Sequence, residues 1–115
     1  MKKKNIIKDA KDFNRIIKKR NGVVNKYFIV NSEDNLTNDA KFGITFTKNI
    51  GNAVTRNKLK RRVKAIIDNN KNIYDFHKNY IIIIRKDSLF IKYADLEREL
   101  ISLFNRIKGE IDEKK

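Results

Sequence analysis

Residues 41–85 read KFGITFTKNIGNAVTRNKLKRRVKAIIDNNKNIYDFHKNYIIIIR and place a helical pattern between two strand patterns. In residues 41–47 apolar and small polar side chains alternate, which predicts a strand with one apolar face and one polar face that could accept a ligand. Residues 55–69 carry apolar side chains every three to four positions, which predicts an amphipathic helix with Thr55 as its N-cap. Residues 80–85 are almost wholly apolar, as in a central strand that is buried on both faces. The stretch therefore predicts a strand, a helix and a second strand.

Two helices and a further strand segment flank this unit. Residues 8–19 show helical apolar spacing that ends at Asn21-Gly22, and a longer apolar stripe begins at Tyr93. Residues 23–31 are rich in β-branched and aromatic side chains, so we expect a strand that pairs with the strand at residues 41–47. The stripes expected to be buried are Ala10, Phe13, Ile16 and Ile17 in the first helix, Leu59, Val63, Ile66 and Ile67 in the second, and Leu96, Leu100, Leu103, Phe104, Ile107 and Ile111 in the third.

The order of these elements predicts an α+β fold. We expect a two-layer α/β sandwich in which three helices pack on a small mixed sheet of about four strands, in the order α-β-β-β-α-β-α. Three strands can be placed directly, and the fourth would come from a break within residues 23–31 or from a short piece near the N-terminus. Because there is no proline and no repeat, nothing marks a linker. Residues 1–115 are therefore expected to form a single domain, with residues 112–115 frayed.

The positive charge of the chain is concentrated in two segments. The 115 residues contain 28 Lys and Arg against 14 Asp and Glu, which gives a formal net charge of +14. Residues 1–31 hold ten basic and two acidic side chains, and residues 40–67 hold eight basic and no acidic ones. A general bias toward lysine would not remove Asp and Glu from one segment. Clustered cations gain free energy by releasing counterions from a polyanion, so nucleic acid is the favoured partner and an anionic membrane surface the second.

The composition excludes several kinds of site. The absence of cysteine excludes disulfides, thiolate metal ligands and cysteine nucleophiles, and a single histidine, His77, excludes a His–His metal motif. A magnesium site built from carboxylates alone is still allowed. The longest apolar run, residues 80–84, is far shorter than the roughly 20 residues of a membrane span, and the N-terminal segment shows no signal-peptide core. We therefore expect a cytoplasmic protein.

Residues 48–64, KNIGNAVTRNKLKRRVK, combine a tight turn with a basic helix. The turn at residues 51–54 leads into the helix, whose first turn presents free amides and a dipole that favour an anion. Arg56, Lys60 and Lys64 follow four residues apart on one face, over about 12 Å. A polyanionic partner would relieve the repulsion among them. The alternative interpretation is an ordinary basic face in contact with water.

This segment resembles the GNAVxRNRxKRxxR signature of the bacterial ribonuclease P protein subunit. The matching residues are Gly51, Asn52, Ala53, Val54, Arg56, Asn57, Lys58, Lys60, Arg61 and Lys64. Further matches follow in the family's order and approximate spacing at Asp12-Phe13, Phe28, Gly43-Ile44, Thr47-Lys48 and Tyr80 to Arg85. The departures are lysine in place of arginine at Lys41, Lys58 and Lys64, and Asn49 in place of lysine. Lysine keeps the charge but not the planar fork that arginine offers to a phosphate.

The resemblance implies the protein subunit of an endoribonuclease. The chain would bind a large catalytic RNA, and the complex would remove the 5′ leader of precursor tRNA by Mg²⁺-dependent hydrolysis of one phosphodiester bond. The RNA would hold most of the metal ions and carry out catalysis, so the protein would have no catalytic or metal-binding residues and would be inactive alone. Neither DNA nor a membrane is an expected partner. The resemblance also implies a sandwich whose βαβ crossover is left-handed, an exception to the usual rule.

Two RNA-binding surfaces are implied by the same resemblance. The basic helix would face the RNA subunit through Arg56, Asn57, Lys58, Lys60, Arg61 and Lys64. A cleft between the first helix and the sheet would receive the single-stranded leader, with Phe13, Ile17, Phe28 and Lys48 as candidates by matching position, and Thr45 and Thr47 by strand alternation. Aromatic rings stack on unpaired bases, and basic groups follow the phosphates. Packing in the core is the alternative role for Phe13 and Phe28.

Three other functions remain open on the sequence. A ribosomal or general RNA-binding protein with the same sandwich would bind RNA without promoting precursor cleavage. A self-sufficient nuclease would need a carboxylate metal site, such as Asp68 and Asp75 on one face of a continued helix, but the asparagines at residues 69–72 predict that the helix ends there. A membrane-surface binder would bind anionic vesicles without RNA, although no helix here pairs a basic face with a large apolar one.

Overall fold

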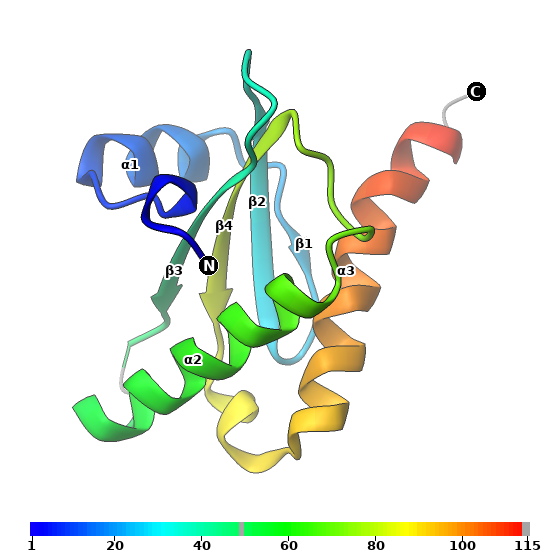
Figure 1. Cartoon of the computed structure of the whole chain (residues 1–115). Coiled ribbons are helices and arrows are strands. Elements are labelled where there is room, and N and C mark those ends of the chain that lie inside the picture. The colour runs from blue at the N-terminus through cyan, green and yellow to red at the C-terminus, as the bar shows by residue number, and fades with distance from the viewer. Residues whose placement is uncertain (49, 114–115) are drawn as a thin grey trace.

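The computed structural model describes residues 1–48 and 50–113 (Figure 1). The elements in chain order are the 3-10 helix η1 (Lys3–Asn5), α1 (Ala10–Lys18), β1 (Val23–Val24), β2 (Phe28–Asp34), β3 (Lys41–Phe46), α2 (Ala53–Asn69), β4 (Lys78–Ile84), the 3-10 helix η2 (Lys86–Phe90) and α3 (Tyr93–Glu113). This is the predicted α+β fold with its α-β-β-β-α-β-α order. Of the segment expected to fray, Asp112 and Glu113 belong to α3, whereas Lys114 and Lys115 lie outside the described residues, as does Asn49.

The strands form one four-stranded sheet in the order β1-β2-β4-β3. β4 is antiparallel to β2 and parallel to β3, so that Ile83 lies between Ile29 and Thr45. The predicted central position of the apolar strand at residues 80–85 is therefore confirmed. The expectation that residues 23–31 pair directly with residues 41–47 is wrong, because β4 lies between these strands and takes up hydrogen bonds on both of its edges.

The fourth strand arises from a break within residues 23–31, one of the two predicted origins. The side chain of Asn25 accepts hydrogen bonds from the backbone amides of Tyr27 and Phe28, both at 2.9 Å, and thereby closes the turn between β1 and β2. This pairs Val23 with Val30. The N-terminal segment adds a single bridge, in which Ile6 lies parallel to Phe42 at the edge of β3.

Helices cover the two faces of the sheet unequally. The main core lies between the sheet and helices α2 and α3, and its helical members are the predicted stripe residues Leu59, Val63, Ile66, Ile67, Leu96, Leu100, Leu103 and Phe104. On the other face, α1 packs through Ile16 and Phe13 against Ile7 and Ile81. Because α1 spans only nine residues, it covers part of that face. We call the side of the sheet on which it packs the α1 face.

The β3-α2-β4 crossover has the unusual hand that the resemblance implied. In Figure 1, β3 lies to the left of β4, both strands point downward, and α2 passes in front of the sheet. A chain that leaves β3, crosses in front and returns one strand to the right follows a left-handed path. Among the described residues, no helix is both long enough and apolar enough to cross a membrane.

Candidate nucleic-acid interface

The turn before α2 sets the direction of the basic helix. Gly51 has a φ of +46°, which glycine adopts readily, and the next residue caps the helix. The Asn52 side chain accepts a hydrogen bond from the Thr55 amide at 2.9 Å. The prediction that Thr55 is the N-cap is therefore wrong. The Asn52 side chain caps the helix instead, and the helix begins at Ala53. The earlier start places Arg56 at the end of the first turn rather than at the first helical position.

The basic side chains of α2 lie on the side turned away from the core. Arg56, Asn57, Lys58 and Arg61 are exposed, and Lys60 and Lys64 are half-buried. No ion pair in the part of the chain that the structure describes involves any of these basic groups. Carboxylates of the described residues therefore do not pair with these groups to offset their mutual repulsion.

One cleft joins residues of both predicted surfaces. It has a volume of about 460 Å³ and is lined by Thr45, Phe46, Thr47, Lys48, Ala53, Arg56, Asn57 and Lys60. We call it the β3–α2 cleft. Thr47 continues the pairing of β3 beyond Phe46, since its amide donates to the Ile84 carbonyl at 3.0 Å. The end of β3 is thus held rigidly beside the first turns of α2.

A row of mainly apolar side chains crosses the half of the α1 face beyond helix α1. The strand register aligns Val24, Ile29, Ile83 and Thr45 as successive partners across all four strands. Ile29, Ile83 and Thr45 are half-buried, and Val24 is 46% exposed. Sequence reasoning identified only Thr45 of this cross-strand row, because the other three positions become neighbours only once the register is known.

Two predicted residues of α1 lie on this face. Phe13 is half-buried, and its ring rests on Gly43, where a Cβ atom would come within 2.6 Å of the Phe13 Cζ. Ile17, which the helical spacing placed in the buried stripe, is 37% exposed. Phe13 therefore combines packing on the sheet with an accessible edge.

Phe28 does not belong to this surface. Its side chain is 0% exposed and lies in the core beneath α2 and α3, on the opposite face of the sheet from α1. The structure therefore does not bring Phe28 together with the other leader-cleft candidates, and its burial favours the alternative role of core packing. Ile29, the next residue, points to the α1 face instead, because successive strand residues face opposite sides.

Carboxylates gather at the far end of the same strands. Arg15 donates to Glu33 at 2.7 and 3.0 Å and to Asp12 at 2.6 Å. The hydrogen bonds from Arg15 hold the pKa of Glu33 below its ordinary value, and the bond from Lys78 does the same for Asp34. These groups stay ionised at neutral pH. The strands thus have ion-paired carboxylates at the end near α1, and cations without a described carboxylate partner at the end near the β3–α2 cleft.

The described residues do not offer a metal site. They contain no group of three or more His, Cys, Asp or Glu side chains that could hold a metal ion. Asp68 contacts the amino group of Met1 at 2.6 Å, and Asp75 accepts a hydrogen bond from the His77 amide at 2.8 Å. Because α2 ends at Asn69, the spacing of these two carboxylates does not place them on one helical face.

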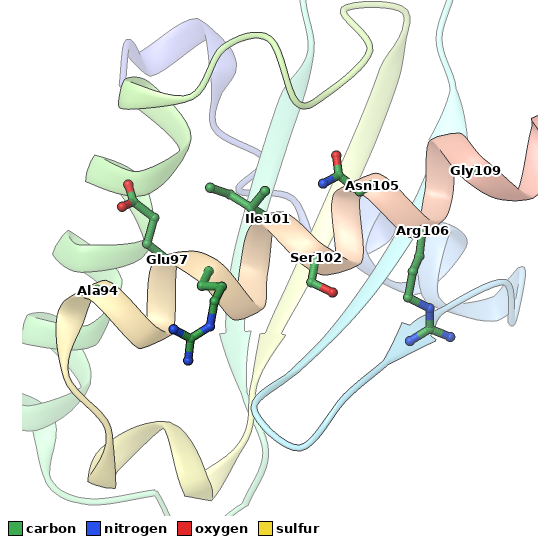
Figure 2. Close-up of a pocket in the computed structure, with 8 residues that line it drawn as sticks. Ala94, Glu97, Ile101, Ser102, Asn105, Arg106 and Gly109 are labelled. Carbon is green, nitrogen blue, oxygen red and sulfur yellow. The ribbon is translucent and has the colours of Figure 1, made fainter.

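A larger hollow lies elsewhere, on the outward side of α3 (Figure 2). Its volume is about 810 Å³, and Glu97, Arg98 and Arg106 bring both signs of charge to it. None of the residues singled out by the sequence lines it. This hollow therefore differs from the β3–α2 cleft, whose basic side chains have no carboxylate partner among the described residues.

Comparison with known proteins agrees with this geometry. The family model of ribonuclease P matches residues 1–108. The ribonuclease P protein component of Mycoplasma mycoides is 42% identical over 109 residues, which cover 94% of this chain and 100% of that protein. The corresponding protein of Streptococcus pneumoniae is 35% identical over 108 residues, covering 94% of this chain and 88% of that protein.

Solved structures show the same fold. The Staphylococcus aureus RNase P protein superposes with a TM-score of 0.82 at 30% identity, covering 90% of this chain and 95% of that one. The RNase P protein of Thermotoga maritima gives a TM-score of 0.79 at 28% identity, covering 87% of this chain and 94% of that one. The chain therefore belongs to the ribonuclease P protein family, the protein part of an RNA–protein endoribonuclease that uses metal ions and removes the 5′ leader of tRNA.

Proposed function

We propose that α2 binds the RNA subunit of ribonuclease P, and that the open part of the α1 face holds the 5′ leader of precursor tRNA. The observation that carries this proposal is the β3–α2 cleft. In it Arg56, Asn57 and Lys60 of the basic helix lie beside Thr45, Thr47 and Lys48 of the sheet. One protein surface can thus contact both RNAs where they meet.

The RNA subunit is assigned to α2 because of its charge. Residues 40–67 carry eight basic side chains and no acidic one, and the described basic groups of α2 form no ion pairs within the protein. Binding a structured polyanion releases counterions and removes the repulsion between these cations. Lys58 and Lys64 contribute attraction as point charges rather than as bidentate forks.

The leader is assigned to the α1 face because that face suits a strand of variable sequence. The cross-strand row of Val24, Ile29, Ile83 and Thr45 offers apolar contact that does not depend on base identity. Phe13 and Ile17 border it from α1, and Lys48 can attract a phosphate. The carboxylates at the far end of the strands are paired with Arg15 and Lys78, whereas the cations at the β3–α2 cleft have no carboxylate partner among the described residues, which favours a phosphate path along the cleft end.

We further propose that the RNA holds the Mg²⁺ ions and carries out the hydrolysis, so that the protein alone is inactive. This proposal is supported by the described residues, which contain no group of three or more side chains that could hold a metal ion. The protein would then act in the cytoplasm by raising the affinity of the complex for substrate and for metal ions.

The direct test is cleavage of precursor tRNA by a bacterial ribonuclease P RNA at low magnesium, with and without the protein, beside the protein alone. We expect a large rate gain only in the mixture. Tight, salt-dependent RNA binding without a rate gain would indicate a general RNA-binding protein instead. Cleavage by the protein alone, abolished by Asp68→Asn, would indicate a nuclease with its own carboxylate site.

Charge removal tests the role of α2. The triple variant Arg56→Gln, Lys60→Gln, Lys64→Gln should weaken binding to the RNA subunit and reduce the slope of log K against log salt by about 2 to 3. A control variant, Arg98→Gln, removes a charge of α3 that pairs with Asp95 and lines neither the β3–α2 cleft nor the Phe76 end of α2, and should leave the slope nearly unchanged. An unchanged slope in the α2 variant would contradict the assignment.

Leader length tests the role of Phe13. Phe13→Ala should weaken binding of precursors with long leaders more than that of precursors with very short ones, because only a long leader reaches the α1 face. Phe13→Leu, which keeps apolar contact with Gly43, serves as the control for folding. Equal losses for both leader lengths would show that Phe13 acts only through packing.

A further inference from the structure

A second cleft lies at the opposite end of α2 from Arg56. Its volume is about 630 Å³, and its walls come from the N-terminal segment, the start of β3, the end of α2 and the loop before β4. The residues that matter here are Lys2, Lys4, Asp39, Lys71, Tyr74 and Phe76. Since the 17 residues of α2 span roughly 25 Å, this cleft is well separated from the β3–α2 cleft. We call it the Phe76 cleft.

An exposed aromatic ring stands at this cleft. Phe76 is 49% exposed and meets Tyr74 edge to face, with ring centroids 5.4 Å apart. Tyr74 in turn meets Phe42 at 4.9 Å, and Phe42 stacks on Tyr80 at 5.5 Å. The exposed ring is therefore supported by a row of aromatic side chains that leads into the core.

The loop that carries Phe76 is held by hydrogen bonds. The Asp75 side chain accepts from the His77 amide at 2.8 Å, and the Asp75 amide donates to the Tyr80 hydroxyl at 3.0 Å. The His77 ring nitrogen Nδ1 lies 2.9 Å from the Thr37 carbonyl oxygen. The position of the ring is thus set before any ligand binds, which lowers the entropy cost of stacking on it.

The charges around the ring favour an anion. The two carboxylates that line the cleft are already paired: Asp39 with Lys4 at 3.5 Å, and Asp68 with the Met1 amino group at 2.6 Å. Lys2 and Lys71 line the same cleft and form no ion pair with any described residue. A supported aromatic face beside uncompensated lysines is the arrangement that binds an unpaired nucleotide.

We propose that the Phe76 cleft binds an unpaired nucleotide of the RNA subunit, with its base stacked on Phe76 and its phosphates near Lys2 and Lys71. This inference rests on the proposed function. The RNA subunit is the partner, rather than the leader, because Tyr74, Phe42 and Tyr80 belong to the core on the α2 side of the sheet, whereas the leader is assigned to the α1 face. The RNA subunit would then contact α2 near both of its ends.

A tryptophan reporter tests whether the ring stacks on a base. The chain contains no tryptophan, so Phe76→Trp introduces a single fluorophore. We expect titration with the ribonuclease P RNA to quench its fluorescence with a stoichiometric end point. Ser102→Trp, on the exposed outward side of α3, is the matched control and should not be quenched (Figure 2). No quenching at position 76 while the RNA is bound, or equal quenching at both positions, would overturn the proposal.

Affinity measurements with the same RNA distinguish the contribution of the Phe76 ring to binding from the contribution of the lysine charges. Phe76→Ala should weaken binding about tenfold, as expected for the loss of one stacked base. Lys71→Gln should lower the salt slope by about 0.7 to 0.9, whereas Arg98→Gln should not. If both cleft variants bind like the unchanged protein while the triple variant of α2 is impaired, the Phe76 site fails and the proposed function stands. If the unchanged protein neither binds the RNA nor stimulates cleavage, the proposed function itself fails.

Discussion

Substituting Gly43 by alanine should displace Phe13 from the sheet. Gly43 is buried in the middle of β3, and a Cβ atom there would lie 2.6 Å from the Phe13 Cζ and 2.7 Å from the Ile81 Cδ1. Both distances are far below the roughly 3.5–4.0 Å of a favourable carbon–carbon contact. Ile81 is 0% exposed and has little room, whereas Phe13 is half-buried. The Phe13 ring is therefore the group that moves.

The cost of this displacement can be bounded. Extra atoms in a packed core typically cost about 1–3 kcal/mol of folding free energy. Replacing glycine within a strand recovers about 0.5–1 kcal/mol, because alanine loses less backbone entropy on folding. Gly43→Ala should therefore lower the free energy of unfolding by between about 0 and 2.5 kcal/mol. Since Phe13 leaves its place beside the cross-strand row, affinity for long leaders should fall as well.

A double-mutant cycle measured by urea unfolding checks the geometry. Phe13→Ala removes the ring that the new Cβ atom would approach most closely. In that background Gly43→Ala should therefore lower the free energy of unfolding by about 1 kcal/mol less than in the unchanged protein. Gly109→Ala is the control, because a Cβ atom at that position meets nothing within 4 Å and the substitution should stabilise α3. If Gly43→Ala costs the same in both backgrounds, the Phe13 ring does not rest on Gly43.

Three further substitutions test single contacts. Asn52→Ala should lower the free energy of unfolding by about 1 kcal/mol through loss of the α2 N-cap, whereas Asn52→Asp should not, as thermal melting would show. Phe28→Ala should cost about 3–5 kcal/mol in urea unfolding and affect long and short leaders equally, because this ring is a core residue. Arg15 holds the pKa of Glu33 below 4.5, so this carboxylate contributes stability above that pH that is lost on further acidification, and Glu33→Gln should flatten the acid limb of the stability profile.

The sequence predicts the buried face of α2 correctly, but it does not predict the residue at which the helix begins. The apolar stripe of α2 was predicted residue by residue, because burial of one helical face imposes a period of 3.6 residues. Its N-cap was assigned to Thr55 instead of Asn52, since both side chains can accept an amide hydrogen bond and they lie three residues apart. The positive φ of Gly51 decides between them, because the chain turns immediately before Asn52.

For the strands, the sequence predicts their existence and the two faces of β3, but neither the pairing of β2 with β4 nor the facing of β2. Residues 23–31 are apolar at successive positions, so alternation could not decide whether Phe28 or Ile29 faces the core. The four isoleucines of β4 carry no alternation at all. Pairing depends on long-range contacts, and here the apolar β4 lies between β2 and β3, although β3 follows β2 directly in the sequence.

The meeting of the two surfaces at one cleft explains what the protein would contribute to the proposed complex. Two RNA strands that approach each other repel through their phosphates, and this repulsion is strongest where the leader passes the RNA subunit. In the proposed complex that point is the β3–α2 cleft, which Lys48 lines just after β3, and Arg56 and Lys60 line from α2. Cations held there offset the repulsion without a conformational change, and they do so more effectively at low salt, where screening is weak.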